Sequence, residues 1–291
     1  MDEAWFFTPT TSRLQEGITA QKIIKEEKPI TVIAGHLSIP WAIAFLPDVY
    51  LFVTERIGTI KRIGSNHHTY SVEGVVSMGE GGLLGMALDP RFRENHFIYL
   101  YVTAADQSDV KNRVERYRFE DDTLSEKKII LEGIPGGTYH DGGRIAFGPD
   151  GYLYITTGDS GKSNLAQDVH SLAGKILSIA SDGSIPSDNP FSNAVWSYGH
   201  RNAQGLARDN RGQLWATEHG RSGVLSGLDE LNHIEKGKNY GWPVIQGETK
   251  KSGMESPIVQ SGPNETWAPA GAVYWDGSVF FGGLRGEAIY E

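Results

Sequence analysis

Polar side chains that could carry out acid–base chemistry stand at both ends of one predicted hairpin. Residues 205–207 (Gly-Leu-Ala) predict a short strand, residues 210–212 (Asn-Arg-Gly) a turn, and residues 213–217 a second strand. His-Arg-Asn precedes this hairpin at residues 200–202, and Glu-His-Gly follows it at residues 218–220. A hairpin with such groups at its ends is typical of a scaffold that positions functional side chains, although a surface hairpin is the simpler alternative for any one residue.

Further loops contain candidate functional residues next to predicted strands. Glu80 lies among glycines, which would let a ligand approach the backbone. His140 is the candidate general base, because imidazole titrates near neutrality and Asp159 could orient it; an exposed turn histidine is the alternative. Arg201 suits a planar carboxylate or a developing oxyanion, and the alternative for it is a surface ion pair.

The strand–turn–strand pattern of this hairpin occurs five times along the chain. Its equivalent strand positions are Ala44, Ala87, Ala146, Ala207 and Val273, at spacings of roughly 43 to 66 residues. Such a repeat predicts a β-propeller, in which equivalent loops converge on one face and bring distant residues into one pocket. A β-sandwich with coincidental hairpins is the alternative. Because the fifth repeat stops at the C-terminus, we expect an incomplete last blade, or a ring closed by the N-terminal segment.

The composition limits the classes of protein to which the chain can belong. It has 291 residues, 36 glycines, no cysteine and a net charge of −9. The acidic charge argues against nucleic acid or anionic membranes as partners, and the lack of cysteine excludes disulfides and thiolate metal sites. No segment is long and apolar enough to predict a membrane span. We expect a lead-in segment at residues 1–30, without a signal peptide, and one all-β domain at residues 31–291.

Several long motifs resemble those of one enzyme family. They are, in order, GEGGLLGMALDP, YHDGGRIAFGPDGYLYITTGD, DGSIPSDNPF, GHRNAQGLA, ATEHG, DELN and KNYGWP. From about Ile39 to the C-terminus, the chain resembles the soluble quinoprotein glucose/sorbosone dehydrogenases, in particular the aldose sugar dehydrogenase group. The resemblance implies a six-bladed β-propeller that binds pyrroloquinoline quinone (PQQ) and Ca²⁺ and oxidises an aldose sugar.

The resemblance also implies partners and a location. The substrate would be a small sugar, and the electrons would pass to an acceptor that the sequence does not identify. We expect a monomer or a dimer. The family resemblance implies an extracellular or periplasmic protein, whereas the acidic N-terminus without a signal peptide leaves a cytoplasmic location open.

Taken residue by residue, the resemblance implies roles in the reaction and in cofactor binding. His140 would take the proton of the sugar hydroxyl while hydride passes to the quinone, and Asp159 would pair with His140. Arg201 would contact the quinone oxygens and polarise the accepting ring, and Asn202 would hold the cofactor. Glu80, in its glycine-rich loop, is a further candidate for cofactor binding.

Two calcium sites are implied as well. The carbonyls of Gly220 and Arg221 would coordinate the calcium that polarises the cofactor. Glu230 and the carbonyl of Tyr240 would hold a second, structural calcium. Carboxylate and carbonyl oxygens are the ligands that Ca²⁺ prefers, so these groups are chemically consistent with both sites.

The chain departs from the family pattern at three places. Arg221 stands where proline is common, but only its backbone oxygen would be used. Arg285 stands where a cofactor-binding lysine is expected, which keeps the charge and changes the geometry. The family's sixth blade, which brings further arginines to the cofactor, has no counterpart after residue 291. A non-catalytic binding propeller is therefore one alternative, and a calcium-dependent, lactonase-like hydrolase is another.

Overall fold

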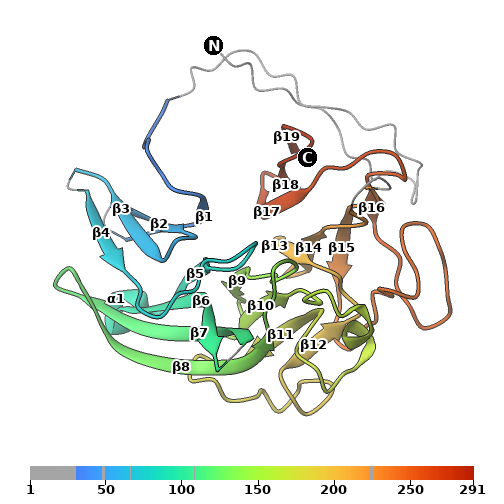
Figure 1. Ribbon diagram of the computed structural model, residues 1–291, viewed down its shortest axis with the longest axis horizontal. Helices are drawn as coiled ribbons and strands as arrows, with labels where there is room; N and C mark the ends of the chain where they lie inside the picture. Colours follow the sequence, from blue (N-terminus) through green and yellow to red (C-terminus); the bar gives the residue numbers. More distant parts are fainter. Residues whose placement is uncertain (1–30, 48–49, 66, 108, 223–225) are drawn as a thin grey trace.

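Five short antiparallel β-sheets, arranged radially, form the framework of the described chain (Figure 1). The computed structural model describes residues 31–47, 50–65, 67–107, 109–222 and 226–291, and the predicted lead-in segment, residues 1–30, lies outside this part. Within each sheet, consecutive strands pair in an order that follows the chain. The prediction of an all-β propeller is therefore confirmed.

The strands divide among the sheets as follows. The first sheet contains β1 (Pro40–Phe45), β2 (Leu51–Glu55), β3 (Thr59–Ile63) and β4 (His68–Ser71), and the second contains β5 (Leu83–Leu88), β6 (Phe97–Asp106), β7 (Asp109–Glu120) and β8 (Thr123–Pro135). The third contains β9 (Ile145–Phe147), β10 (Leu153–Thr157), β11 (Lys175–Ile179) and β12 (Val195–Tyr198). The fourth contains β13 (Ala203–Arg208), β14 (Leu214–Glu218), β15 (Glu230–Ile234) and β16 (Val259–Gln260), and the fifth contains β17 (Pro269–Trp275), β18 (Ser278–Gly283) and β19 (Ala288–Tyr290).

The number of blades differs from the six that the family resemblance implied. The described residues form four sheets of four strands and a fifth sheet of three strands. The physical reason is that residues 269–290 supply only one hairpin and one further strand, so no strands remain in the described part for another sheet. The three-stranded fifth sheet agrees with the expectation of an incomplete last blade.

Helices are short in this fold. α1 (Phe92–Asn95) follows β5, and the 3₁₀ helix η1 (Ser163–Gln167) lies between β10 and β11. Neither is long and apolar enough to cross a bilayer, and the same holds for every helix in the described residues.

The innermost strand of four sheets is irregular at its first residues. β1, β5, β13 and β17 each show a register shift there against the second strand of the sheet. Such bulges bend a strand and re-aim its side chains, and they are frequent at barrel rims and beside functional sites. These four register shifts lie at the start of the inner strands. This is the rim at which the sequence predicts the functional residues.

Adjacent sheets pack face to face and bury apolar clusters between them. Phe52 of the first sheet and Leu100 of the second are fully buried members of one such cluster. The inner strands approach so closely that a β-carbon on Gly85 would lie 2.2 Å from the carbonyl oxygen of Gly143. That distance is far below van der Waals contact, so only glycine fits where β5 passes the segment before β9.

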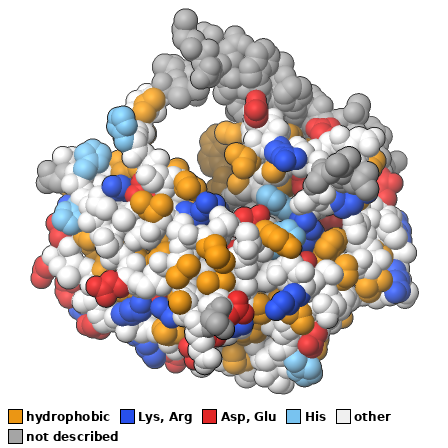
Figure 2. Space-filling view, viewed as in Figure 1, with side chains coloured by type: hydrophobic (Ala, Val, Ile, Leu, Met, Phe, Trp, Pro, Cys, Tyr) orange, Lys and Arg blue, Asp and Glu red, His pale blue; other side chains and the backbone are white. Residues whose placement is uncertain are grey.

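The first and fifth sheets are separated by an opening (Figure 1). Ile43 and Phe45 on β1 are exposed, and so are Val273 and Trp275 on β17. Figure 2 shows hydrophobic side chains beside this opening. Two partly apolar sheet faces therefore remain on the surface of the described part of the chain.

The fifth sheet should depend for its stability on Trp267, which precedes β17. This side chain is fully buried against Phe281 and Tyr290, whereas Trp275 at the end of β17 is 60% exposed. Trp267→Ala should lower the free energy of unfolding by about 3–5 kcal/mol, because it leaves a cavity in the cluster. Trp275→Ala, the matched control, should cost less than about 1 kcal/mol. Denaturant titration compares the two, and equal losses would contradict this packing.

Candidate active site

His140 and Asp159 form a hydrogen-bonded pair at the rim of the third sheet. The loop before β9 supplies His140, and Asp159 follows closely after the end of β10. His140 Nδ1 lies 2.7 Å from Asp159 Oδ1. The Asp159 side chain is buried and the His140 side chain is partly exposed. The structure thus brings together the two residues for which the resemblance implies a pair.

The position of His140 is set by its own loop. Its backbone adopts a left-handed conformation, with φ +62°, and its N–H donates to Glu80 Oε2 at 2.8 Å. A β-carbon on Gly158 would lie 1.9 Å from the carbonyl oxygen of His140. A glycine at position 158 is therefore required for the His140 loop to lie against the end of β10.

Three hydrogen-bond donors converge on the carboxylate of Asp159. Besides His140, the backbone N–H of Gly161 donates to Oδ1 at 2.8 Å, and the indole N–H of Trp242 donates to Oδ2 at 2.8 Å. Burial acts to raise the pKa of Asp159, but these hydrogen bonds outweigh it and hold the pKa below its ordinary value. Asp159 is therefore ionised at neutral pH and accepts a hydrogen bond from the Nδ1–H group of His140.

Arg201 lies buried near this pair, with only 6% of its surface exposed. Its Nη2 donates to Ser222 Oγ at 2.8 Å, its Nη1 to the carbonyl of His219 at 3.3 Å, and its guanidinium carbon lies 5.4 Å from the ring centre of Trp242. Its Nε has no hydrogen-bond partner among the described residues. Burial lowers the pKa of Arg201, and the charge of Asp159 opposes this effect. A buried guanidinium with an unused donor suits an anionic ligand.

Glu80 and Asn202 lie against the His140 loop from the neighbouring sheets. Asn202 Nδ2 donates to Glu80 Oε2 at 3.3 Å, and Asn202 Oδ1 accepts the N–H of Gly142 at 3.1 Å. Loops of the second, third and fourth sheets therefore meet at one point. Both residues, predicted to bind the cofactor, stand beside His140 and stabilise its loop.

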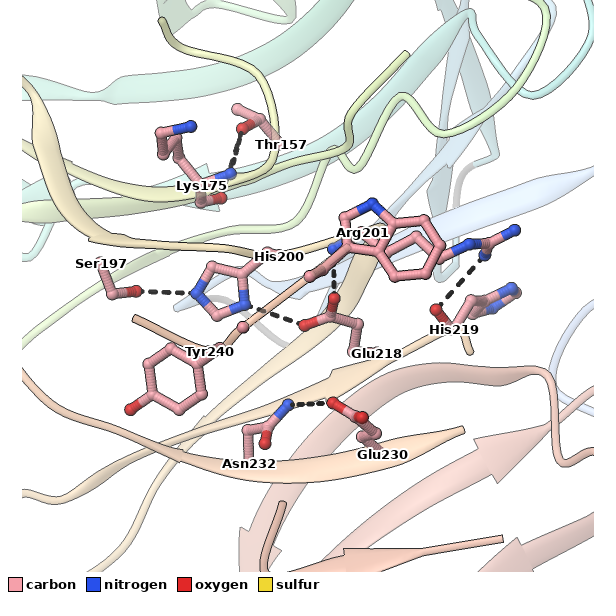
Figure 3. A network of polar contacts seen from close by, with 12 residues as sticks. Thr157, Lys175, Ser197, His200, Arg201, Glu218, His219, Glu230, Asn232 and Tyr240 are labelled. Carbon is pink, nitrogen blue, oxygen red and sulfur yellow. Dashed lines mark hydrogen bonds and ion pairs between the residues drawn. The ribbon is translucent and has the colours of Figure 1, made fainter. Parts of the chain in front are cut away.

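A buried series of hydrogen bonds supports Arg201 (Figure 3). Ser197 Oγ lies 2.9 Å from His200 Nε2, and His200 Nδ1 lies 2.8 Å from Glu218 Oε2. The other oxygen of Glu218 accepts the backbone N–H of Arg201. The ring of His200 stacks on that of Tyr240, with 4.7 Å between their centres. His200 thus fixes Glu218 and, through it, the backbone of Arg201.

Three of the predicted calcium ligands, Gly220, Glu230 and Tyr240, line one small cavity. Its volume of about 10 Å³ leaves room for a single water-sized occupant. Burial, followed by the negative charge of Glu218, raises the pKa of Glu230 to about 8. Two carboxylates beside such a cavity make it chemically suited to a small cation.

Arg221 occupies a different position from the other three. Its N–H donates to the carbonyl of Gly227 at 2.8 Å, and its own carbonyl accepts the N–H of Gly227 at 3.3 Å. It does not belong to the cavity wall. In the part of the chain that the structure describes, no group of three or more His, Cys, Asp or Glu side chains is placed to hold a metal. A calcium site here would therefore need backbone carbonyls in addition to the carboxylates.

Arg285 stands in the turn between β18 and β19. Its backbone N–H donates to the carbonyl of Trp267 at 3.1 Å, and its side chain is exposed. β18 ends opposite Pro269, the first residue of β17, so this turn lies at the same rim as His140. Within the described residues, however, the structure shows no hydrogen bond between Arg285 and the residues around Arg201.

The central position of Trp242 was not predicted from the sequence. It joins Asp159 to Arg201, although it lies 83 residues from Asp159 along the chain. A signal was present, because Trp242 belongs to the KNYGWP motif, in which only Tyr240 received a role. An aromatic ring with an N–H donor next to a predicted ligand usually needs a polar partner when it is buried. Ser222 gave no comparable signal.

Comparisons with known proteins identify the family of this β-propeller. The model of the family described as Glucose / Sorbosone dehydrogenase matches residues 37–291. The PQQ-bound aldose sugar dehydrogenase of Streptomyces coelicolor is 42% identical and superposes with a TM-score of 0.84, over 90% of this chain and 79% of that one.

Two curated relatives are similar over a smaller share of their own length. Quinoprotein glucose dehydrogenase B of Acinetobacter calcoaceticus is 36% identical over 76% of this chain and 54% of its own. Aldose sugar dehydrogenase YliI of Escherichia coli is 36% identical over 78% of this chain and 65% of its own. The chain thus spans between about half and two thirds of the length of these two relatives. Together, the matched family model and these identities show that the chain belongs to the glucose/sorbosone dehydrogenase family.

Proposed function

We propose that this protein is a PQQ-dependent oxidoreductase that oxidises a hydroxyl of an aldose-type sugar. The observation on which the proposal rests is the His140–Asp159 pair, held at 2.7 Å beside the buried guanidinium of Arg201. A hydrogen-bonded imidazole–carboxylate pair is suited to proton abstraction. The names of the relatives, quinoprotein glucose dehydrogenase and aldose sugar dehydrogenase, support both the reaction and the cofactor.

The residues at the rim fit a cofactor that bears several carboxylates. Arg201 is buried, and its Nε has no partner in the described part of the chain, so a bound anion would satisfy it. Trp242 offers an aromatic face against the same guanidinium. Arg201 and Asn202 would hold the cofactor, with Glu80 and Arg285 as further candidates. When bound, PQQ supplies the two-electron acceptor for oxidation of the sugar.

His140 acts as the general base in this proposal. Asp159 accepts a hydrogen bond from Nδ1, so the proton-accepting lone pair of the neutral imidazole is on Nε2. Nε2 takes the proton from the sugar hydroxyl as the C–H bond of the same carbon is broken. The carboxylate of Asp159 stabilises the imidazolium that forms, and the donors from Gly161 and Trp242 keep that carboxylate ionised and fixed.

Calcium belongs to the proposal at two places. Glu230 and the carbonyl of Tyr240 would hold a structural Ca²⁺ in the small cavity, where a positive charge would offset the burial of the Glu230 carboxylate and the charge of Glu218, which together raise its pKa. The carbonyls of Gly220 and Arg221 would hold a second Ca²⁺, which would polarise the cofactor. The monomeric or dimeric state and the extracellular or periplasmic location stay predictions.

His140→Gln should slow sugar oxidation by about 10²–10⁴-fold, because it removes the general base while preserving size and polarity. Its melting temperature and PQQ affinity should stay close to those of the wild type. Arg201→Ala, in contrast, should lose PQQ affinity and rate together, because its charge faces the anionic ligand. PQQ titration beside steady-state kinetics with an artificial acceptor and a panel of aldoses measures both effects.

If the reconstituted wild type is active and His140→Gln keeps more than about a tenth of its rate, His140 is not the base. A wild type that binds no PQQ would contradict the dehydrogenase proposal itself. A wild type that binds PQQ but oxidises no aldose would favour the non-catalytic alternative, and lactone hydrolysis with calcium alone would favour the lactonase-like one.

The contribution of Glu230 to the stability of the calcium-free protein should fall as pH rises from about 4.5 to about 8. Glu230 keeps its proton up to about pH 8 in the folded state but loses it near its ordinary pKa of 4.5 when unfolded, so folding takes up a proton in this range. Calcium should reverse the trend, because it binds the ionised carboxylate and stabilises the native state. Melting curves with chelator and with excess Ca²⁺ measure this.

Glu230→Gln should remove both the Glu230 part of the pH dependence and the calcium-induced shift. Glu235→Gln is the matched control, since Glu235 is exposed on the same chain segment, and it should leave the calcium shift unchanged. An equal calcium shift in Glu230→Gln and in the wild type would place the ion elsewhere.

A further inference from the structure

Lys175, in β11, is a completely buried lysine to which the proposed reaction gives no role. Its Nζ donates to the carbonyls of Leu165 at 2.8 Å, of Ala166 at 3.0 Å and of Ala173. An ammonium group has three donors, so all of them are used. No carboxylate forms an ion pair with it in the described part of the chain, and burial lowers its pKa to about 7.

A buried cation that is paired only with carbonyls is costly to desolvate, and an unbranched apolar side chain would fill the same space. The contacts of Lys175 indicate what the charge is used for. All three acceptors belong to the segment 165–173, which contains the end of η1 and the loop that leads into β11. The hydrogen bonds of Lys175 therefore hold this segment against the third sheet.

The fastened segment reaches Trp242 along two routes. Gln167 Nε2 donates to the carbonyl of Trp242 at 2.6 Å, and Gln167 also exchanges hydrogen bonds with the side chain of Asn239. The carbonyl of Ala166 accepts the N–H of Gly199 at 2.9 Å, and the carbonyl of Gly199 accepts the N–H of Trp242 at 2.9 Å. The backbone of Trp242 is thus held on both its N–H and its carbonyl side.

Trp242 in turn donates its indole N–H to Asp159, which binds His140. We propose that Lys175 is a positioning residue for the His140–Asp159 pair, which it acts on by fastening the segment that places Trp242 against Asp159. The effect of Lys175 on catalysis rests on the proposed function. The effect of Lys175 on the placement of Trp242 does not rest on it, and this placement can be measured in the cofactor-free protein.

The strand that bears Lys175 is anchored independently of its side chain. Its backbone N–H donates to Thr157 Oγ1 at 3.0 Å (Figure 3), and Thr157 is its register partner in β10. Replacing the ammonium group should therefore release the segment 165–173 and leave β11 in place. This makes Lys175→Met a selective variant, because methionine keeps the length and apolar body of the side chain.

The test follows the carboxyl group of Asp159 by ¹³C NMR titration in the cofactor-free protein. Lys175→Met, Gln167→Leu and Trp242→Phe should each shift the pKa of Asp159 upward, because each removes or displaces the indole donor that stabilises the carboxylate. The double variant Lys175→Met/Trp242→Phe should shift it no further than Trp242→Phe alone, because both changes act through one hydrogen bond. In the reconstituted enzyme, kcat should fall about tenfold in each single variant, the effect of losing one hydrogen bond to a charged group.

Lys162→Met is the matched control, since Lys162 is exposed immediately before η1 and its loss should change neither quantity. Additive shifts in the double variant, or an unchanged Asp159 titration in folded Lys175→Met, would overturn the proposal. If Lys175→Met fails to fold, Gln167→Leu tests the step from the segment to Trp242 on which the proposal depends, because it removes the direct contact to Trp242 and leaves the ammonium group intact; an unchanged Asp159 titration in Gln167→Leu would then overturn the proposal. A wild type without sugar oxidation would refute the proposed function, and the NMR result would still decide the role of Lys175.

Discussion

Close contact between the inner strands of neighbouring sheets is the constraint on which the candidate site depends. At Gly85, a β-carbon would overlap the carbonyl oxygen of Gly143 from the neighbouring sheet, and at Gly158 one would overlap the carbonyl oxygen of His140 within the third sheet, so only glycine allows either approach. Because of this approach, loops from the second, third and fourth sheets meet at Glu80, His140 and Asn202. Bulges at the starts of β5 and β13 lie at the same rim. The radial packing thus places residues far apart in the sequence within hydrogen-bond distance.

The rim concentrates buried charge, and most of its charged groups are stabilised by hydrogen-bond donors or acceptors. Asp159 receives three donors, the backbone of Arg201 is bound by Glu218, and Lys175 donates to three carbonyls. Glu230 is different, because its pKa is raised to about 8 beside the charge of Glu218. Satisfied groups of this kind fix a geometry, whereas a buried guanidinium donor without a partner, or a carboxylate whose pKa is raised by burial and a neighbouring negative charge, is suited to a ligand. Arg201 Nε and Glu230 are therefore the groups to which the cofactor and calcium proposals assign partners.

The sequence predicted the repeating strands and the pair His140–Asp159 better than it predicted their surroundings. The hairpin predicted at 205–217 matches β13 and β14 to within two residues, because short apolar runs between turn signals mark such strands. Trp242 and Lys175 could not be assigned, since their roles depend on contacts between segments that no local pattern records. The number of blades also differed from the prediction. The family resemblance implied six blades, whereas the described residues supply strands for only five sheets.

The central claim is that one rim of this propeller binds PQQ where His140 can take a proton from a sugar. A single-turnover experiment tests it most directly: PQQ is titrated into the calcium-loaded protein, and one aldose is then added without any other electron acceptor. The account predicts saturable binding of one PQQ per chain and a loss of the oxidised quinone's absorbance after the sugar is added. Binding that does not saturate, or an absorbance that is unchanged by every aldose tried, would contradict it.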